Sequence, residues 1–361
     1  MEMMEEQLES KQLKIFSAIA FGLPVIMGLF MWYGYNTKGN IDLFTLTHMY
    51  YPAAGAMMAL LISGKAKKTI PKAFFIGYLI QTGMMIACSL LGLFMGGSTF
   101  MMIGSFVMIL GSIFLWIALP VAKKERREAY GLRRKNGKLT VALVLLFVVL
   151  YTARMVIYYV IEGELGSMTE IFSKSQTWLF LVQTLVSYLI MFAPYFGEEY
   201  GWRYFLQPML QKKYGMVKGV LLLGIVWGLW HLPLNFFYYT SPAIGIISVA
   251  NQLVVCITMG IFMGWVYMKT DNVWSVVAIH FLNNNLAPIF AGDLTGESMS
   301  GYSIGWSDVA TAAVIMTLCY AWPIITKYFR NRNHLNLTPE ARANQLIEEP
   351  VPKKNITTKY A

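Results

Sequence analysis

Glu198, His231 and His280 lie at three separate points of an otherwise apolar sequence. An ionisable side chain inside a membrane segment costs about 2.5–3.5 kcal/mol on insertion scales, so each of the three needs a partner or a function. A carboxylate and two imidazoles are the groups that hydrolytic enzymes use to activate water and move protons. The three positions therefore predict hydrolysis of a bond such as an amide.

The spacing of the acidic motif assigns different roles to its members. Glu199 and Arg203 are four residues apart and share one face of a helix, which predicts an ion pair between them. Glu198 points to one side of that face and is left free for chemistry. We expect Glu198 to act as the general base that activates water, with Glu199 and Arg203 in support; a buried ion pair that only orders the helices is the alternative for those two.

The histidine motifs supply the remaining groups. Trp227 lies one turn before His231 on the same face, and His280 lies four residues before Asn284. We expect His231 to hold the water or transfer a proton. His280 and Asn284 would donate hydrogen bonds to the oxyanion that forms at the scissile carbonyl.

The same residues also match a zinc site. Two imidazoles and one carboxylate form a common catalytic zinc set, with water as the fourth ligand, so His231, His280 and Glu198 are candidate ligands. The soluble zinc-peptidase motif His-Glu-x-x-His is absent from the sequence. Zinc and metal-free activation of water both remain open at this point.

The elements that position these residues are membrane helices. Of the 361 residues, 57% are apolar and 13% are charged, against roughly 45–50% and about 25% in soluble domains. A span needs about 20 consecutive apolar residues, and unbroken apolar runs exclude a β-barrel. We therefore predict an all-α, polytopic membrane protein with about ten spans, near residues 13–34, 42–63, 73–95, 99–121, 139–161, 176–197, 217–237, 243–267, 273–290 and 305–326.

The net charge of +10 reports orientation and not nucleic-acid binding, because the basic residues lie in short loops between spans. The loops at 64–72 and 122–138 are rich in Lys and Arg, which predicts that they and both termini are cytoplasmic. We expect the first span to remain as an anchor in the cell membrane. Counted from the cytoplasmic ends of their helices, the three motifs lie at about 14–21 Å, so they can meet at one height.

Composition divides the chain into three parts. Residues 1–138 form a four-span extension with a basic linker, residues 139–327 carry the candidate site, and residues 328–361 form a polar cytoplasmic tail that we expect to be poorly ordered. His48 is expected near the surface without partners. The small-residue spacings Gly224-x-x-x-Gly228 and Gly260-x-x-x-Gly264 predict close helix packing.

Glu198-Glu199-x-x-x-Arg203, an aromatic residue four before His231, and His280-x-x-x-Asn284, each on its own helix, together resemble the CPBP family. That family includes CAAX prenyl endopeptidases and bacterial Abi proteins of bacteriocin processing and self-immunity. The resemblance covers residues 176–290 and implies an intramembrane endopeptidase, often described as a metalloprotease. It implies catalytic roles for Glu198, His231, His280 and Asn284. Trp227 replaces the more usual Phe, a change expected to alter pocket shape and not chemistry.

The sequence leaves three functions open. The first is a peptidase that cleaves a membrane-associated or lipid-modified peptide in contact with membrane lipid. The second is a non-enzymatic immunity or scaffold protein in which the motif survives as structure. The third is a proton-coupled transporter, which ranks lowest because no second copy of the polar segment is present in the N-terminal half.

Overall fold

The structure is a computed structural model that describes residues 2–63, 69–293 and 300–348. All regular structure in these ranges is helical, so the predicted all-α class is confirmed. Among the described residues, six helices are long and apolar enough to cross a bilayer, or eight if two bent pairs each form one span. The chain is thus a multi-pass membrane protein. The predicted spans 42–63 and 273–290 are helical but fall outside this count.

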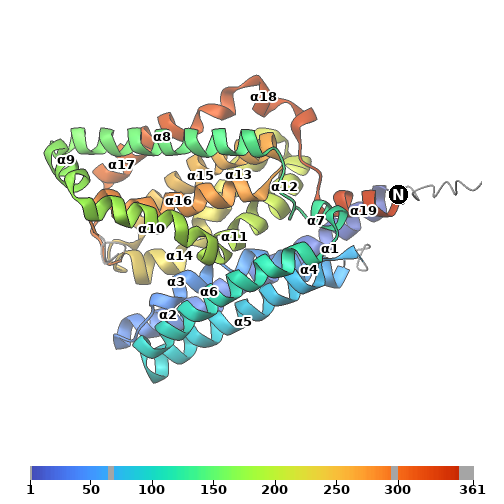
Figure 1. Cartoon of the computed structure of the whole chain (residues 1–361), viewed down its shortest axis with the longest axis horizontal. Helices are drawn as coiled ribbons and strands as arrows, with labels where there is room; N and C mark the ends of the chain where they lie inside the picture. Colours follow the sequence, from blue (N-terminus) through green and yellow to red (C-terminus); the bar gives the residue numbers. More distant parts are fainter. Residues whose placement is uncertain (1, 64–68, 294–299, 349–361) are drawn as a thin grey trace, which may run out of the picture.

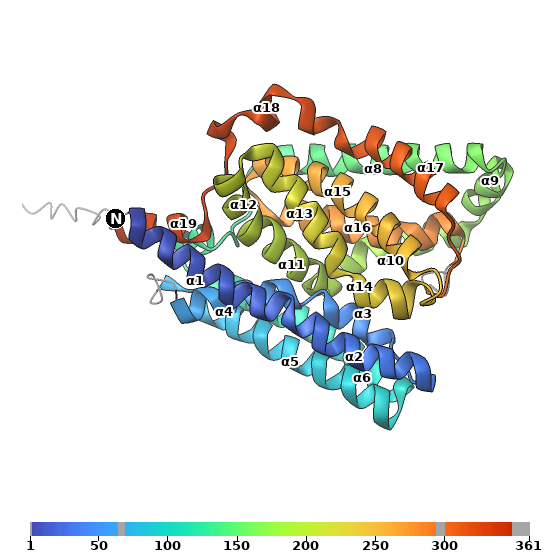
Figure 2. The ribbon, with the colours of Figure 1, turned by 180° about the vertical axis from the view of Figure 1, so that it is seen from behind.

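The helices stack in two layers, seen from opposite sides in Figures 1 and 2. The N-terminal layer contains α1 (Glu2–Ala20), α2 (Gly22–Thr37), α3 (Asp42–His48), α4 (Tyr51–Ser63), α5 (Lys72–Met95) and α6 (Gly97–Val121). The basic linker carries α7 (Lys124–Ala129). Loop residues 64–68, part of the predicted cytoplasmic basic loop, lie outside the described residues.

The second layer is the core that carries the candidate residues. Its segments are α8 (Gly137–Ile161), α9 (Leu165–Ser173), α10 (Ser175–Met191), α11 (Ala193–Glu199), the π-helical η2 (Tyr200–Leu206), α12 (Gln207–Tyr214), α13 (Met216–Trp230), α14 (Leu232–Leu234), the π-helical η3 (Asn235–Tyr239), α15 (Gly245–Thr270), α16 (Val273–Ala291), α17 (Trp306–Met316), the π-helical η5 (Thr317–Ala321) and the 3₁₀-helical η6 (Trp322–Ile325).

Two of the predicted spans are bent beside candidate residues. The chain turns by 69° between α10 and α11 and by 41° between α13 and α14. Pro194 and Pro233 lie in the first turns after these breaks, and proline has no N–H with which to continue the preceding helix. Glu198 lies just after the first bend, and His231 lies at the second.

Glycines bring the helices of the core into close contact. A Cβ on Gly224 would lie 2.7 Å from the Cα of Ile257, and one on Gly228 would lie 2.9 Å from the side chain of Leu253. A Cβ on Gly260 would lie 3.6 Å from the Cα of Gly224. The predicted packing role of the spacings in α13 and α15 is confirmed.

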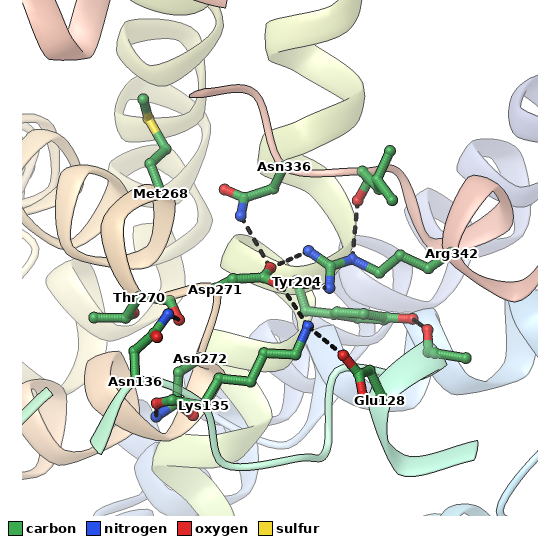
Figure 3. A network of polar contacts seen from close by, with 12 residues as sticks. Glu128, Lys135, Asn136, Tyr204, Met268, Thr270, Asp271, Asn272, Asn336 and Arg342 are labelled. Atoms are coloured by element: carbon green, nitrogen blue, oxygen red, sulfur yellow. Dashed lines mark hydrogen bonds and ion pairs between the residues drawn. The ribbon is translucent and has the colours of Figure 1, made fainter. Parts of the chain in front are cut away.

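The C-terminal tail is not poorly ordered over residues 328–348, contrary to expectation. It forms α18 (Lys327–Arg330), the 3₁₀ turn η7 (Arg332–His334) and α19 (Pro339–Glu348). Figure 3 shows why it packs: Asp271, after α15, accepts hydrogen bonds from Asn336 and Arg342 of the tail and from Lys135 of the linker. These contacts compensate for burying charged groups. Residues 349–361 lie outside the described residues.

Candidate active site

Trp227 occupies the centre of the candidate site. Its indole Nε1 donates a 2.6 Å hydrogen bond to Oε2 of Glu198, and its ring lies 5.8 Å from the ring of His280 and 6.2 Å from that of His231. The guanidinium carbon of Arg203 lies 4.7 Å from the indole centroid, a cation–π contact. One residue of α13 therefore touches side chains from α11, η2 and α16.

The contact between Trp227 and Glu198 corrects one sequence-based expectation. Phenylalanine, the more usual residue at this position, has no donor and could not make this bond. Tryptophan at position 227 therefore changes the polar surroundings of Glu198 as well as the pocket shape. The indole of Trp202 donates to the same oxygen at 3.4 Å. Glu198 is buried, and both donors come from indoles. No hydrogen bond joins it to either imidazole within the described residues.

His231 is held in one tautomer by its own helix. Nδ1 lies 2.8 Å from the carbonyl oxygen of Trp227, and because a carbonyl only accepts, Nδ1 carries the proton. In the neutral ring Nε2 then has the free lone pair. The backbone is fixed as well, since the Asn235 side chain donates to the His231 carbonyl at 3.0 Å and Ser248 donates to Asn235 at 2.6 Å.

The predicted Glu199–Arg203 ion pair is present, with Nε of Arg203 3.0 Å from Oε2 of Glu199. The second oxygen of Glu199 lies 2.9 Å from Nδ1 of His280, which sequence reasoning did not foresee. All three side chains are buried. A carboxylate shared by a guanidinium and an imidazole fixes the orientation of the histidine and leaves its Nε2 for another partner.

Asn284 is the one candidate without a hydrogen bond, ion pair or ring contact to another candidate within the described residues. Its Oδ1 accepts a 3.0 Å bond from Asn283, and its amide nitrogen donates no hydrogen bond within the described ranges. It is half-buried. The neighbouring Asn285 donates instead to the hydroxyl of Tyr195 at 2.8 Å, and Tyr195 packs against the His280 ring at 5.6 Å.

The side chains as arranged do not fit a zinc ion. Among the described residues, no group of three or more His, Cys, Asp or Glu side chains is placed to hold a metal. Glu198 is engaged by two indoles, and each histidine uses Nδ1 for a protein acceptor. The zinc interpretation stays a prediction.

His48 is a residue of this site that sequence reasoning placed wrongly. It is buried, 2% exposed, and its Nε2 lies 3.1 Å from the carbonyl oxygen of Trp230. Its ring lies 3.8 Å from the Trp230 ring and 6.2 Å from the His231 ring. The signal was weak because His48 ends a short helix, far in sequence from the other motifs.

The helices of the site are similar in sequence to a known family of membrane proteases. The family model described as type II CAAX prenyl endopeptidase Rce1-like matches residues 176–286. The similarity to CAAX proteases is confined to this segment. The CAAX prenyl protease 2 of Methanococcus maripaludis is 34% identical over 104 residues, which cover 27% of this chain and 38% of that protein. No solved structure matches the chain.

The match to the CAAX-protease family contains every candidate residue predicted from the motifs, from Glu198 to Asn284. It ends before α17 and begins after α9, so it leaves out the N-terminal layer and the tail. His48, which touches Trp230, therefore lies in a part of the chain that the family model does not match.

Proposed function

We propose that this chain is an intramembrane endopeptidase of the CAAX type, which hydrolyses a peptide bond near the end of a membrane-associated or prenylated peptide. The family match and the similarity to a CAAX prenyl protease support this class of activity. The observation that carries the proposal is the meeting of Glu198, His231 and His280 around one indole inside a helical membrane bundle.

In the proposed reaction Glu198 accepts a proton from a water molecule, and the oxygen of that water attacks the scissile carbonyl carbon. His231 orients that water through the lone pair on Nε2, which the Trp227 carbonyl leaves free by holding the proton on Nδ1. The attack converts the carbonyl to a tetrahedral oxyanion. The proton on Glu198 then passes to the leaving amine as the carbon–nitrogen bond breaks.

His280 and Asn284 stabilise the oxyanion in this mechanism. Nε2 of His280 donates when the ring carries both protons, and Glu199 opposite Nδ1 balances the resulting charge. Asn284 offers an amide nitrogen that no described residue occupies. Glu199 and Arg203 position His280 and do not touch the substrate.

The basic linker and the other basic loops support a cytoplasmic location for both termini in the cell membrane. The active site would then be reached from the cytoplasmic side. A zinc-dependent route is tested separately by elemental analysis of active, detergent-purified protein together with a chelator. If the protein contained stoichiometric zinc and its removal abolished cleavage, a zinc-dependent mechanism would replace the metal-free one.

The experiment that tests the function uses Glu198→Gln, which keeps the shape of the side chain and removes the base. The substrate is an internally quenched, farnesylated peptide that ends in Cys-aliphatic-aliphatic-X, with the unprenylated peptide as a second arm. General-base catalysis contributes about 10²–10⁴-fold, so cleavage should fall at least about a hundredfold.

Glu162→Gln is the matched control because Glu162 is an exposed carboxylate in the loop after α8. It should cleave at the wild-type rate. Purified Glu198→Gln protein that is monodisperse and fully active would refute the peptidase assignment. In that case the non-enzymatic immunity or scaffold interpretation would replace it.

A further inference from the structure

The bend between α10 and α11 separates two backbone groups that would otherwise bond to each other. In a continuous helix the carbonyl of Leu189 would accept a hydrogen bond from the N–H of Ala193, four residues later. Phe192 interrupts the helix between them, and no backbone hydrogen bond joins the two groups in the described chain. Lipid offers no hydrogen bonds in return, so each group needs a partner from the protein.

Two side chains of α6 are those partners. Nε1 of Trp116 donates to the carbonyl oxygen of Leu189 at 2.7 Å, and the N–H of Ala193 donates to Oγ of Ser112 at 3.4 Å. Ser112 and Trp116 are four residues apart and therefore lie on one face of α6. This face offers one donor and one acceptor, which replace the two halves of the hydrogen bond that the bend removes.

Phe192, the residue at the break, is also held by α6. The centroid of its buried ring lies 4.4 Å from that of Trp116 and 5.5 Å from that of Trp274. Trp116 and Trp274 stack on each other at 4.9 Å. Trp274 belongs to α16, the helix of His280. The side chains of α6 therefore contact both the start of the helix that carries Glu198 and the helix that carries His280.

The direction of α11 after the bend determines where Glu198 lies. Glu198 is five residues after Ala193, which is about 7.5 Å along the helix, so a change of about 10° at Ala193 moves the carboxylate by about 1 Å. A misplacement of that size can lower the rate of an enzyme by about a hundredfold. The hydroxyl of Tyr78 on α5 donates to the Ala193 carbonyl at 3.3 Å, so the N-terminal layer holds the start of α11 from a second helix.

We infer that α6 is a positioning element of the proposed peptidase, in which Ser112 and Trp116 hold the bend that directs Glu198 toward the two histidines. The inference rests on the proposed function, in which Glu198 is the base. Among the described residues, Ser112 and Trp116 make no hydrogen bond, ion pair or ring contact to Glu198, His231 or His280, so they act through the backbone of α10 and α11. Helix α6 lies outside residues 176–286, so this role belongs to the N-terminal extension.

The first experiment measures the bend and needs no activity. Spin labels on Leu185→Cys in α10 and Lys213→Cys in α12, both at exposed positions, give the distance across the bend by double electron–electron resonance in detergent. The native cysteines are buried. Trp116→Phe keeps a ring at this position and removes the N–H. It should shift the distances to longer values, because the Leu189 carbonyl regains a backbone partner only if the helix straightens. An unchanged distance distribution would overturn the inference.

The second experiment measures kcat and KM for the farnesylated peptide. Ser112→Ala and Trp116→Phe should each lower kcat about tenfold and leave KM nearly unchanged, because a misplaced base slows the chemical step and not binding. A purely structural role predicts instead a lower melting temperature with an unchanged kcat for the folded protein. That result in both variants would refute the positioning role.

Ser105→Ala is the matched control. Ser105 lies two turns before Ser112 on α6, and its hydroxyl donates to the Met101 carbonyl of its own helix at 2.9 Å. Ser105→Ala should leave both kcat and the distance distribution unchanged, and equal losses of kcat in Ser105→Ala and Ser112→Ala would contradict the inference. Wild-type protein that cleaved no peptide would refute the proposed function, whereas the spin-label distances would still decide whether α6 holds the bend.

Discussion

Trp227 connects the proposed base to both histidines, and its indole N–H makes the shortest hydrogen bond to Glu198, at 2.6 Å. We predict that Trp227→Phe lowers kcat for the farnesylated peptide about tenfold and leaves KM nearly unchanged. A hydrogen bond to a charged group is worth about 1.5–3 kcal/mol, and the carboxylate would lose its position when this bond is removed. Steady-state kinetics on purified protein measure both constants.

Trp202→Phe is the control for Trp227→Phe, because its indole donates to the same carboxylate oxygen from 3.4 Å. The longer bond should matter less, so the loss in kcat should be smaller. Equal kcat for Trp227→Phe and wild type would show that the indole only fills space.

His48 acts on the site through the backbone. Its Nε2 donates to the carbonyl of Trp230, at the C-terminal end of α13 where carbonyls lack partners within the helix. We predict that His48→Phe lowers kcat several-fold with little change in KM. The Trp230 carbonyl would lose its hydrogen bond, and the imidazole of His231, the next residue, would shift. His48→Gln carries a donor near the Nε2 position and should restore most of the rate.

The His48 prediction separates positioning from packing. Phenylalanine preserves the ring that packs against Trp230, so a purely structural role predicts that His48→Phe is active and that His48→Gln is the worse variant. That order of activities would contradict the prediction.

Local spacing predicted some contacts of the site and missed others. The Glu199–Arg203 pair follows from helix geometry, since residues four apart share a face. The hydrogen bonds from His280 to Glu199 and from Trp227 to Glu198 join separate helices. The spacing of residues within one helix does not specify which residues of another helix will face them. His48 was missed for the same reason.

At the scale of elements, the predicted spans α5, α6 and α8 agree with the structure to within two residues at each end. Long apolar runs specify such helices well. The bend of 69° after α10 was not predicted, although Pro194 carries its signal. A proline shows that a helix can break, but the packing of the neighbouring helices determines the angle.

The helix that carries Glu198 rests directly on the N-terminal layer. A Cβ on Gly201 would lie 2.3 Å from Cβ and 2.6 Å from the carbonyl carbon of Pro52 on α4, and backbone cannot yield as a side chain can. We predict that Gly201→Ala lowers both the melting temperature and the peptidase rate. Overpacking of this kind costs about 1–3 kcal/mol. Thermal unfolding in detergent and the cleavage assay measure the two effects.

Gly83→Ala is the control for the contact between the layers. Nothing lies within 4 Å of a Cβ at Gly83 in α5, and alanine is favoured over glycine inside a helix by about 1 kcal/mol. Gly83→Ala should therefore be as stable as the wild type or slightly more stable. A Gly201→Ala protein with unchanged melting temperature and activity would mean that α4 and η2 separate without consequence.

At the scale of the whole molecule, the tail joins the two layers at one end of the bundle. Thr338 donates to Glu9 of α1 at 2.7 Å, and Gln12 of α1 donates to Glu340 of α19 at 2.9 Å. Arg342 pairs with Asp271 beyond α15. Composition predicted a poorly ordered segment because a polar sequence buries little apolar area. Composition carries no information about the charged partners that α1, the linker and the α15–α16 turn contribute.

The tail contacts make stability depend on pH through Asp271. Burial raises the pKa of this carboxyl, but hydrogen bonds and charge from Arg342 and Lys135 outweigh burial and lower the pKa below its ordinary value of 3.8. A group whose pKa is lowered by folding stabilises the protein above its unfolded pKa and loses that contribution as the pH falls through the folded value. Asp271 also adopts a left-handed backbone with φ 45°, which asparagine tolerates.

Asp271→Asn therefore removes the charge while keeping shape and backbone. We predict that it lowers the stability at pH 7 by about 1–3 kcal/mol, since hydrogen bonds to charged groups are lost at a carboxylate that is 28% exposed. The difference from wild type should shrink as the pH falls below about 4. Melting temperatures recorded from pH 3 to pH 7 measure it, with Glu162→Gln as an exposed control that shows no difference at any pH. If the difference in melting temperature between Asp271→Asn and wild type stayed constant down to pH 3, packing and not the Asp271 charge would hold the tail.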